Sequence, residues 1–122
     1  IGADGKIYVA DTWNRRVQVF EKDEASFAYR AVSSWDVSAW YGSSLENKPF
    51  IAVDASGNVF ITDPESFRVV EFNSAGEVLR VWGELGTAPA GFNLASGIMV
   101  DREGLLWVSD GINNNLQRFE LP

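Results

Sequence analysis

The sequence contains no cysteine and no histidine among its 122 residues. Without cysteine, the chain can form neither disulfides nor thiolate metal ligands. Without histidine, it lacks the commonest general base near neutral pH and the commonest zinc ligand. No Ser–His or Cys–His pair, no glycine-rich phosphate loop after a strand and no isolated carboxylate pair is present either. We therefore predict no catalytic residue, no metal ligand and no cofactor site in this chain.

Basic residues and long apolar runs are also scarce. Ten Lys and Arg residues stand against 17 Asp and Glu residues, which gives a net charge of −7. This balance repels phosphate backbones, and no basic cluster offsets it, so nucleic acid is not an expected partner. No apolar run approaches the roughly 20 residues that cross a bilayer, and no secretory signal pattern occurs. We expect no direct membrane insertion of this segment.

The sequence does contain a repeat, which is visible when three stretches are aligned without a gap. These stretches are "DGKIYVADTWNRRVQVF", "SGNVFITDPESFRVVEF" and "EGLLWVSDGINNNLQRF". Their shared aspartates, Asp11, Asp63 and Asp110, are separated by 52 residues (63 − 11) and then 47 (110 − 63). The match extends to "IAVD" and "IMVD", and a Trp precedes the last residue of each by 19 positions (54 − 35 and 101 − 82). Repeats of this length are typical of β-propeller blades.

Each repeat has the pattern of four short strands bounded by Gly, Asn, Asp and Ser. The second strands, "IYVA", "VFIT" and "LLWV", are apolar at nearly every position, which indicates sheets buried on both faces. We therefore predict an all-β fold: a β-propeller segment of four-stranded antiparallel blades, with about ten strands. Because a closed propeller needs roughly 4–8 blades, the ring is expected to be incomplete.

The alignment also predicts the limits of each blade. Blade 1 spans residues 1–47, lacks most of its first strand and carries an enlarged connection at 21–34. Blade 2 spans 48–93, and blade 3 spans 94–122 and lacks its last strand. Unpaired edges and uncovered apolar faces favour association, so we predict that the segment alone is not a well-behaved monomer. Either remaining blades in cis or copies of this chain would close the ring.

The repeated segments "DGKIYVADTWNRRVQVF", "IAVDASGNVFITD" and "GIMVDREGLLWVSD" resemble the NHL repeat family, with Ser66 and Asn115 departing from its usual Asn and Arg. The resemblance implies the propeller fold but leaves function open, because the family includes RNA-binding propellers, extracellular sensor domains, a zinc-dependent amidating lyase and cell-surface repeats. The lyase relies on histidine ligands, so no catalytic residue carries over. The stretch "WDVSAWYGSSLENKPFIAVDASGNVFITDPE" is similar to propellers at the C-terminus of multi-pass bacterial membrane proteins of glycosyltransferase type.

The polar residues that recur in the repeats have a structural interpretation. A ring of carboxylates could bind a metal. Because an aspartate occurs in every repeat, however, we favour a structural role in which it caps the turn after its strand. The same interpretation applies to Asp54 and Asp101. Each Arg five residues later is expected to bond its aspartate across the turn, with an Asn giving a neutral hydrogen bond in the third repeat. These structural positions are Asp11, Asp63, Asp110, Arg16, Arg68 and Asn115.

Residues that differ between the repeats are the candidates for binding, because loops on a rigid scaffold commonly carry function. Tolerated variation is the alternative. The enlarged connection, with Phe27, Tyr29 and Arg30, forms either a second contact patch or a solvated hairpin. The candidate binding loop positions, for which the sequence indicates no common structural demand, are Trp13, Arg15, Phe67, Ile112 and Asn114.

These observations favour a non-catalytic binding or scaffold module that contacts a protein, or a small or polymeric ligand, of unknown identity. We expect it to belong to a larger extracytoplasmic or membrane-anchored bacterial protein. One alternative is part of a metal-dependent propeller enzyme, lactonase- or lyase-like, whose catalytic residues lie in missing blades. An RNA-binding propeller is a more distant alternative.

Overall fold

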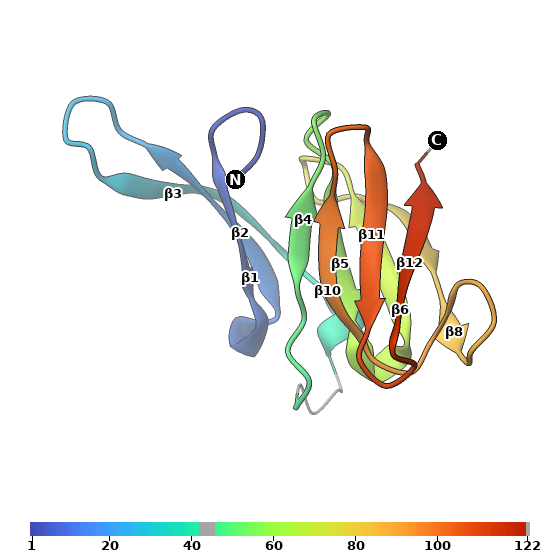
Figure 1. The fold of residues 1–122 in the computed structure, drawn as a ribbon. Helices are drawn as coiled ribbons and strands as arrows, with labels where there is room; N and C mark the ends of the chain where they lie inside the picture. Colours follow the sequence, from blue (N-terminus) through green and yellow to red (C-terminus); the bar gives the residue numbers. More distant parts are fainter. Residues whose placement is uncertain (42–45, 122) are drawn as a thin grey trace.

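A computed structural model describes residues 1–41 and 46–121 of the chain (Figure 1). It contains three antiparallel sheets in chain order and one short parallel pair. Residues 42–45 of the predicted first blade and Pro122 of the predicted third blade lie outside the described residues. The predicted blade limits stay a prediction.

The strands of the three sheets number three, four and three, and each sheet follows chain order. The first sheet contains β1 (Ile7–Asp11), β2 (Arg16–Lys22) and β3 (Tyr29–Asp36). The second contains β4 (Ile51–Val53), β5 (Val59–Asp63), β6 (Arg68–Phe72) and β7 (Val78–Trp82). The third contains β10 (Ala95–Val100), β11 (Leu105–Asp110) and β12 (Asn115–Glu120). The predicted all-β fold with about ten strands is confirmed, and the sheets do not close a ring.

Several short elements were not predicted from the sequence. A parallel pair, β8 (Glu84–Leu85) and β9 (Gly91–Phe92), lies in the connection between the second and third sheets. Three single-turn 3-10 helices are η1 (Thr12–Asn14), η2 (Ser38–Trp40) and η3 (Pro64–Ser66). Two of these turns, η1 and η3, follow repeated aspartates and place the next strand for antiparallel pairing.

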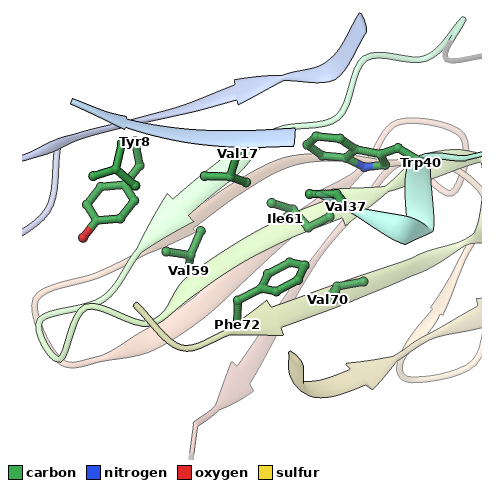
Figure 2. Close-up of a cluster of buried hydrophobic side chains, with 9 residues drawn as sticks. Tyr8, Val17, Val37, Trp40, Val59, Ile61, Val70 and Phe72 are labelled. Atoms are coloured by element: carbon green, nitrogen blue, oxygen red, sulfur yellow. The ribbon is translucent and has the colours of Figure 1, made fainter. Parts of the chain in front are cut away.

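Apolar side chains fill the space on both sides of the second sheet. On one side, Tyr8 and Val17 of the first sheet share a cluster with Val59, Ile61 and Phe72 of the second. Figure 2 shows these side chains, with the Trp40 ring of η2 at one end of the cluster. A second cluster joins the other face of the second sheet to the third sheet; it contains Phe60, Val69, Phe92, Ala95, Leu106 and Val108.

Burial along the second strand of each repeat follows the number of neighbouring sheets. All five residues of β5 are buried because a sheet lies against each of its faces. Along β11, buried residues alternate with partly exposed ones, since only one face is covered. The uninterrupted apolar run of β5 is therefore explained by burial on both faces.

A tryptophan at the end of one sheet contacts a phenylalanine of the next at both interfaces. The rings of Trp35 and Phe72 lie 6.1 Å apart, centroid to centroid, and those of Trp82 and Phe119 lie 5.9 Å apart. Gly76, in the turn before β7, passes so close to the Trp35 ring that a Cβ at this position would overlap it. The repeat therefore specifies the contacts between sheets as well as the strands.

The enlarged connection at 21–34 forms a hairpin in which Glu21 pairs with Arg30 across β2 and β3. This hairpin extends away from the other two sheets (Figure 1). Phe27 near its tip is 70% exposed, and the Lys22 ammonium lies 4.8 Å from its ring centroid. The five extra residues of the first repeat therefore lengthen an exposed hairpin without entering the core.

Candidate functional site

The loops after Asp11, Asp63 and Asp110 lie at the same end of the stacked sheets, the lower end in Figure 1. At the equivalent position of each loop one residue has a left-handed backbone, and these residues are Arg15 (φ 54°), Phe67 (φ 58°) and Asn114 (φ 52°). The expectation that these positions share no structural demand is therefore wrong. A left-handed residue returns the chain into the next strand, although side chains other than Gly and Asn adopt this conformation at a cost.

The predicted binding loop residues differ in their exposure. Trp13 is 74% exposed and Ile112 is 61% exposed. Phe67, in contrast, packs against the second hydrophobic cluster. Phe67 therefore contributes to the core and offers little surface to a partner. Asn114 is exposed, and its side-chain amide donates to the carbonyl of Ile112 in the same loop.

A group of four residues from two neighbouring loops brings two aromatic rings and two cations together. The Lys48 ammonium lies 4.5 Å from the centroid of the Trp13 ring. The Arg15 guanidinium lies 5.1 Å from the centroid of the Tyr41 ring, which is 54% exposed. We call Trp13, Arg15, Tyr41 and Lys48 the aromatic–cation surface. Cations over aromatic faces at exposed sites contribute about 0.5–1 kcal/mol each.

Trp40 anchors the aromatic–cation surface to the core. Its side chain is fully buried, and its indole N–H donates to the carbonyl of Thr62 in β5 at 3.3 Å. Its own carbonyl accepts a hydrogen bond from the Arg15 Nε at 3.2 Å. Arg15 is therefore held by a residue that is fixed by packing against the second sheet.

A further contact joins this region to η3. The backbone N–H and the side-chain amide of Asn47 both donate to the Glu65 carboxylate, at 3.2 and 3.0 Å. Glu65 occupies the repeat position of Trp13 and Ile112. The repeat does not mark Tyr41, Asn47 or Lys48, because they lie in a connection outside the aligned segments, and no signal in the sequence shows that they lie near Trp13 and Arg15.

Two of the repeated aspartates form ion pairs across the following turn. Arg16 Nε donates to Asp11 at 2.8 Å, and Arg68 Nε donates to Asp63 at 2.8 Å. The hydrogen bond from Arg16, followed by that from Asn14, holds the pKa of Asp11 below its usual range. Neither aspartate makes a side-chain cap bond to its 3-10 turn, so the predicted capping role is wrong for these two. A neighbouring guanidinium offers the stronger, charge-assisted bond.

Asp110 does cap its turn, accepting backbone N–H bonds from Ile112 and Asn113 at 3.1 and 2.9 Å. It also accepts backbone bonds from residues 93 and 94. Burial raises its pKa, but the four backbone bonds outweigh burial, and the pKa lies below the usual range.

Among the described residues, the side-chain partner of Asp110 is Asn113 at 2.8 Å, whereas the sequence predicted Asn115. Asn113 lies within the turn, which explains the difference. Asp54 and Asp101 cap their turns in the same way.

Within residues 1–41 and 46–121, no group of three or more His, Cys, Asp or Glu residues has the arrangement needed to hold a metal ion. Over the same residues, no helix combines the length and apolar character that crossing a membrane requires.

Comparison with known families gives a match between residues 1–20 and the NHL repeat. Over 79 residues, the chain is 33% identical to NHL repeat-containing protein 3 of Mus musculus and 30% identical to that of Homo sapiens. Each alignment covers 62% of this chain. These matches support an NHL-repeat propeller segment. The chain spans 23% of the length of these curated relatives, about a quarter.

Solved structures that resemble this NHL-repeat segment include virginiamycin B lyase from Staphylococcus aureus, with a TM-score of 0.60 and 17% identity. A catalytically inactive variant of that lyase with quinupristin gives the same values. In both cases the alignment covers 99% of this chain and 39% of the other. At this identity the likeness shows a shared fold.

Proposed function

We propose that this NHL-repeat segment is a non-catalytic binding module of a larger protein, and that the aromatic–cation surface contacts a protein partner. The observation that carries the proposal is the pairing of two exposed aromatic rings with two cations at one end of the sheets. The module belongs to a longer chain in this proposal because it corresponds to about a quarter of its curated relatives.

The residue types of this surface suit protein recognition. Trp, Tyr and Arg are the side chains that most often dominate the energy of protein interfaces. Trp13 is 74% exposed, and it offers a rigid ring with few rotatable bonds. The hydrogen bond from Arg15 to Trp40 orders the guanidinium before a partner arrives, which reduces the entropy lost on binding.

Selection from a displayed peptide library tests this proposal without knowledge of the natural partner. Peptides selected on the unmodified chain are expected to bind the Trp13→Ser variant at least tenfold more weakly, since truncating an interface anchor costs about 2 kcal/mol or more. Phe27→Ser is the matched control, because Phe27 is also an exposed ring beneath a lysine but lies in the distant hairpin. Selected peptides that bind both variants equally well would contradict the proposal.

Membership in an enzyme is the second candidate, favoured by the lyase names of the similar structures. Because this sequence contains no histidine, a lyase reaction that uses histidine would require residues from other blades. Incubation of the chain with quinupristin, followed by liquid chromatography, is expected to leave the compound unchanged, and its conversion would support the enzyme instead. The extracytoplasmic location and the bacterial origin stay predictions. Cell fractionation of the full-length protein tests the location.

A further inference from the structure

Arg15 of the aromatic–cation surface forms no ion pair with any carboxylate among the described residues, although the chain has 17 acidic residues against 10 basic ones. Its neighbour Arg16, in contrast, bonds Asp11 at 2.8 Å. The other basic side chains that pair with carboxylates of the chain are Lys6, Arg30, Arg68 and Arg80. The positive charge of Arg15 is therefore not neutralised by a contact within the described part of the chain.

Neutral groups hold the Arg15 guanidinium in place. Its Nε donates to the carbonyl of the buried Trp40 at 3.2 Å, and its central carbon lies 5.1 Å from the centroid of the Tyr41 ring. Its two Nη groups donate to no acceptor among the described residues. Two N–H groups of one guanidinium bind both oxygens of a carboxylate in parallel, and a charged acceptor forms the stronger bond. The outer end of Arg15 is thus ordered for a carboxylate that the described residues do not supply.

The carboxylates of the surrounding loops are engaged by other groups. Three side chains donate to Asp11, and Asn47 donates to Glu65 through its backbone and its amide. Asp36, at the end of β3, is exposed and makes no ion pair with Arg15. Exposed charges more than about 8 Å apart are largely screened at physiological ionic strength. The acidic excess of the remaining chain therefore repels a carboxylate at Arg15 only weakly.

Arg15 and Tyr41 lie where the first sheet meets the second. Trp40, which joins them to the core, belongs to the hydrophobic cluster between these two sheets and bonds the carbonyl of Thr62 in β5 (Figure 2). A further blade of a longer chain would pack on the outer face of the first or the third sheet, and not between the first and the second. The setting of Arg15 is therefore formed by contacts that this chain already contains.

We propose that the protein partner of the aromatic–cation surface presents an acidic segment, in which the carboxylate of an Asp or Glu side chain binds the two Nη groups of Arg15. This inference rests on the proposed function of the surface. The exposed rings of Trp13 and Tyr41 accompany the cation, so the acidic residue needs apolar neighbours to contact them. A carboxylate within a peptide has such neighbours on both sides, whereas a carboxylate at the chain end has them on one side.

The peptides that the displayed library yields are the probes. Each is synthesised with a C-terminal amide, which leaves side chains as the source of carboxylates, and again with every Asp replaced by Asn and every Glu by Gln. Fluorescence anisotropy measures their affinity for the complete 122-residue chain and its variants, and circular dichroism verifies folding. Arg15→Gln removes the charge. Arg118→Gln is the matched control, because Arg118 also lies over a ring, 5.9 Å from the Trp107 centroid, but in β12 of the third sheet.

Peptides selected on the unmodified chain are expected to be richer in Asp and Glu than the unselected library. Their amide versions are expected to bind the unmodified chain about tenfold more weakly. Arg15→Gln is expected to weaken the acidic peptides about tenfold but the amide versions less than about twofold, because the carboxylate and the guanidinium act as a pair. Arg118→Gln is expected to bind both versions as the unmodified chain does.

The outcomes separate this inference from the proposed function. Peptides that require Trp13 but show no acidic enrichment, or that bind equally well as amides, would overturn the inference and leave the proposed function intact. A selection without any peptide that depends on Trp13 would contradict both. Equal losses in Arg15→Gln and Arg118→Gln would also overturn the inference, because they would indicate general attraction to positive charge. The amide peptides test it even if Arg15→Gln does not fold, since they leave the protein unchanged.

Discussion

The ion pair between Glu71 and Arg80 gives the sharpest prediction for stability. Glu71 lies in β6 with no exposed surface, and Arg80 Nε in β7 donates to its carboxylate at 2.5 Å. The hydrogen bond to Glu71 raises the pKa of Arg80, so the guanidinium stays charged. The second carboxylate oxygen of Glu71 is buried without a partner among the described residues. Removing Arg80 would therefore leave a buried, uncompensated charge.

The repeat supplies both the substitutions and the control. In the first sheet, the positions of Glu71 and Arg80 are held by Val19 and Ser33, which pair across β2 and β3. Arg80→Ser alone is expected to lower the free energy of unfolding by about 2–3 kcal/mol, which is less than the roughly 3–5 kcal/mol of a fully buried ion pair because the Arg80 side chain is 37% exposed. The double variant, Glu71→Val with Arg80→Ser, recreates the pair of the first sheet and is expected to recover most of this loss.

The exposed pair of Glu21 and Arg30 is the control, because it also joins two paired strand residues nine positions apart. Its side chains are 44% and 67% exposed, so Arg30→Ser is expected to cost no more than about 1 kcal/mol. Urea unfolding, followed by circular dichroism at a concentration where light scattering shows one species, measures all four proteins. A loss in Arg80→Ser no larger than in Arg30→Ser, or a double variant no more stable than Arg80→Ser, would refute the reasoning.

Two further predictions concern Gly76 and Asp11. Gly76→Ala is expected to lower the free energy of unfolding by about 2 kcal/mol or more, because the new Cβ would overlap the Trp35 ring and the backbone has φ 86°. Gly104→Ala is expected to lower it by about 1 kcal/mol, because Gly104 has φ 83° but open space around it. Equal urea midpoints for the two variants would contradict this. Because the hydrogen bond from Arg16 lowers the pKa of Asp11, the stabilisation from this ion pair is complete above about pH 4 and is lost as pH falls further. Urea midpoints between pH 7 and pH 2.5 should therefore show the unmodified chain and Asp11→Asn converging at low pH, and a constant difference would argue against the role of the pair.

The strands and their order could be predicted from the sequence because the repeat aligns three examples of each of its two middle strands and two examples of each outer strand. A buried strand such as β5 shows an uninterrupted apolar run, and the aligned Trp35 and Trp82 mark equivalent strands. The short pair β8 and β9 was missed because it occurs once, outside the aligned segments. Two-residue strands depend on contacts between distant residues more than on local sequence.

The loops were harder to interpret, because residue type does not show the backbone conformation. Phe67 is predicted in a binding loop, but its side chain packs against the second hydrophobic cluster, whereas Arg15 and Asn114, with the same left-handed backbone, do not. Conversely, Tyr41 and Lys48 become part of the candidate site only when folding places them over Arg15 and Trp13. Side chains from separate loops form this surface, and no spacing in the sequence records their proximity.

The complete burial of β5 between two sheets has a consequence for how the chain opens. In a linear array of repeats, stability is a sum of the intrinsic terms of each unit and of the interfaces between neighbours. The second sheet takes part in both interfaces and each outer sheet in one, so amide hydrogens should exchange slowest in β5 and β6 and faster in β1 and β12. Local unfolding would then begin at the two ends of the array and reach the middle sheet last.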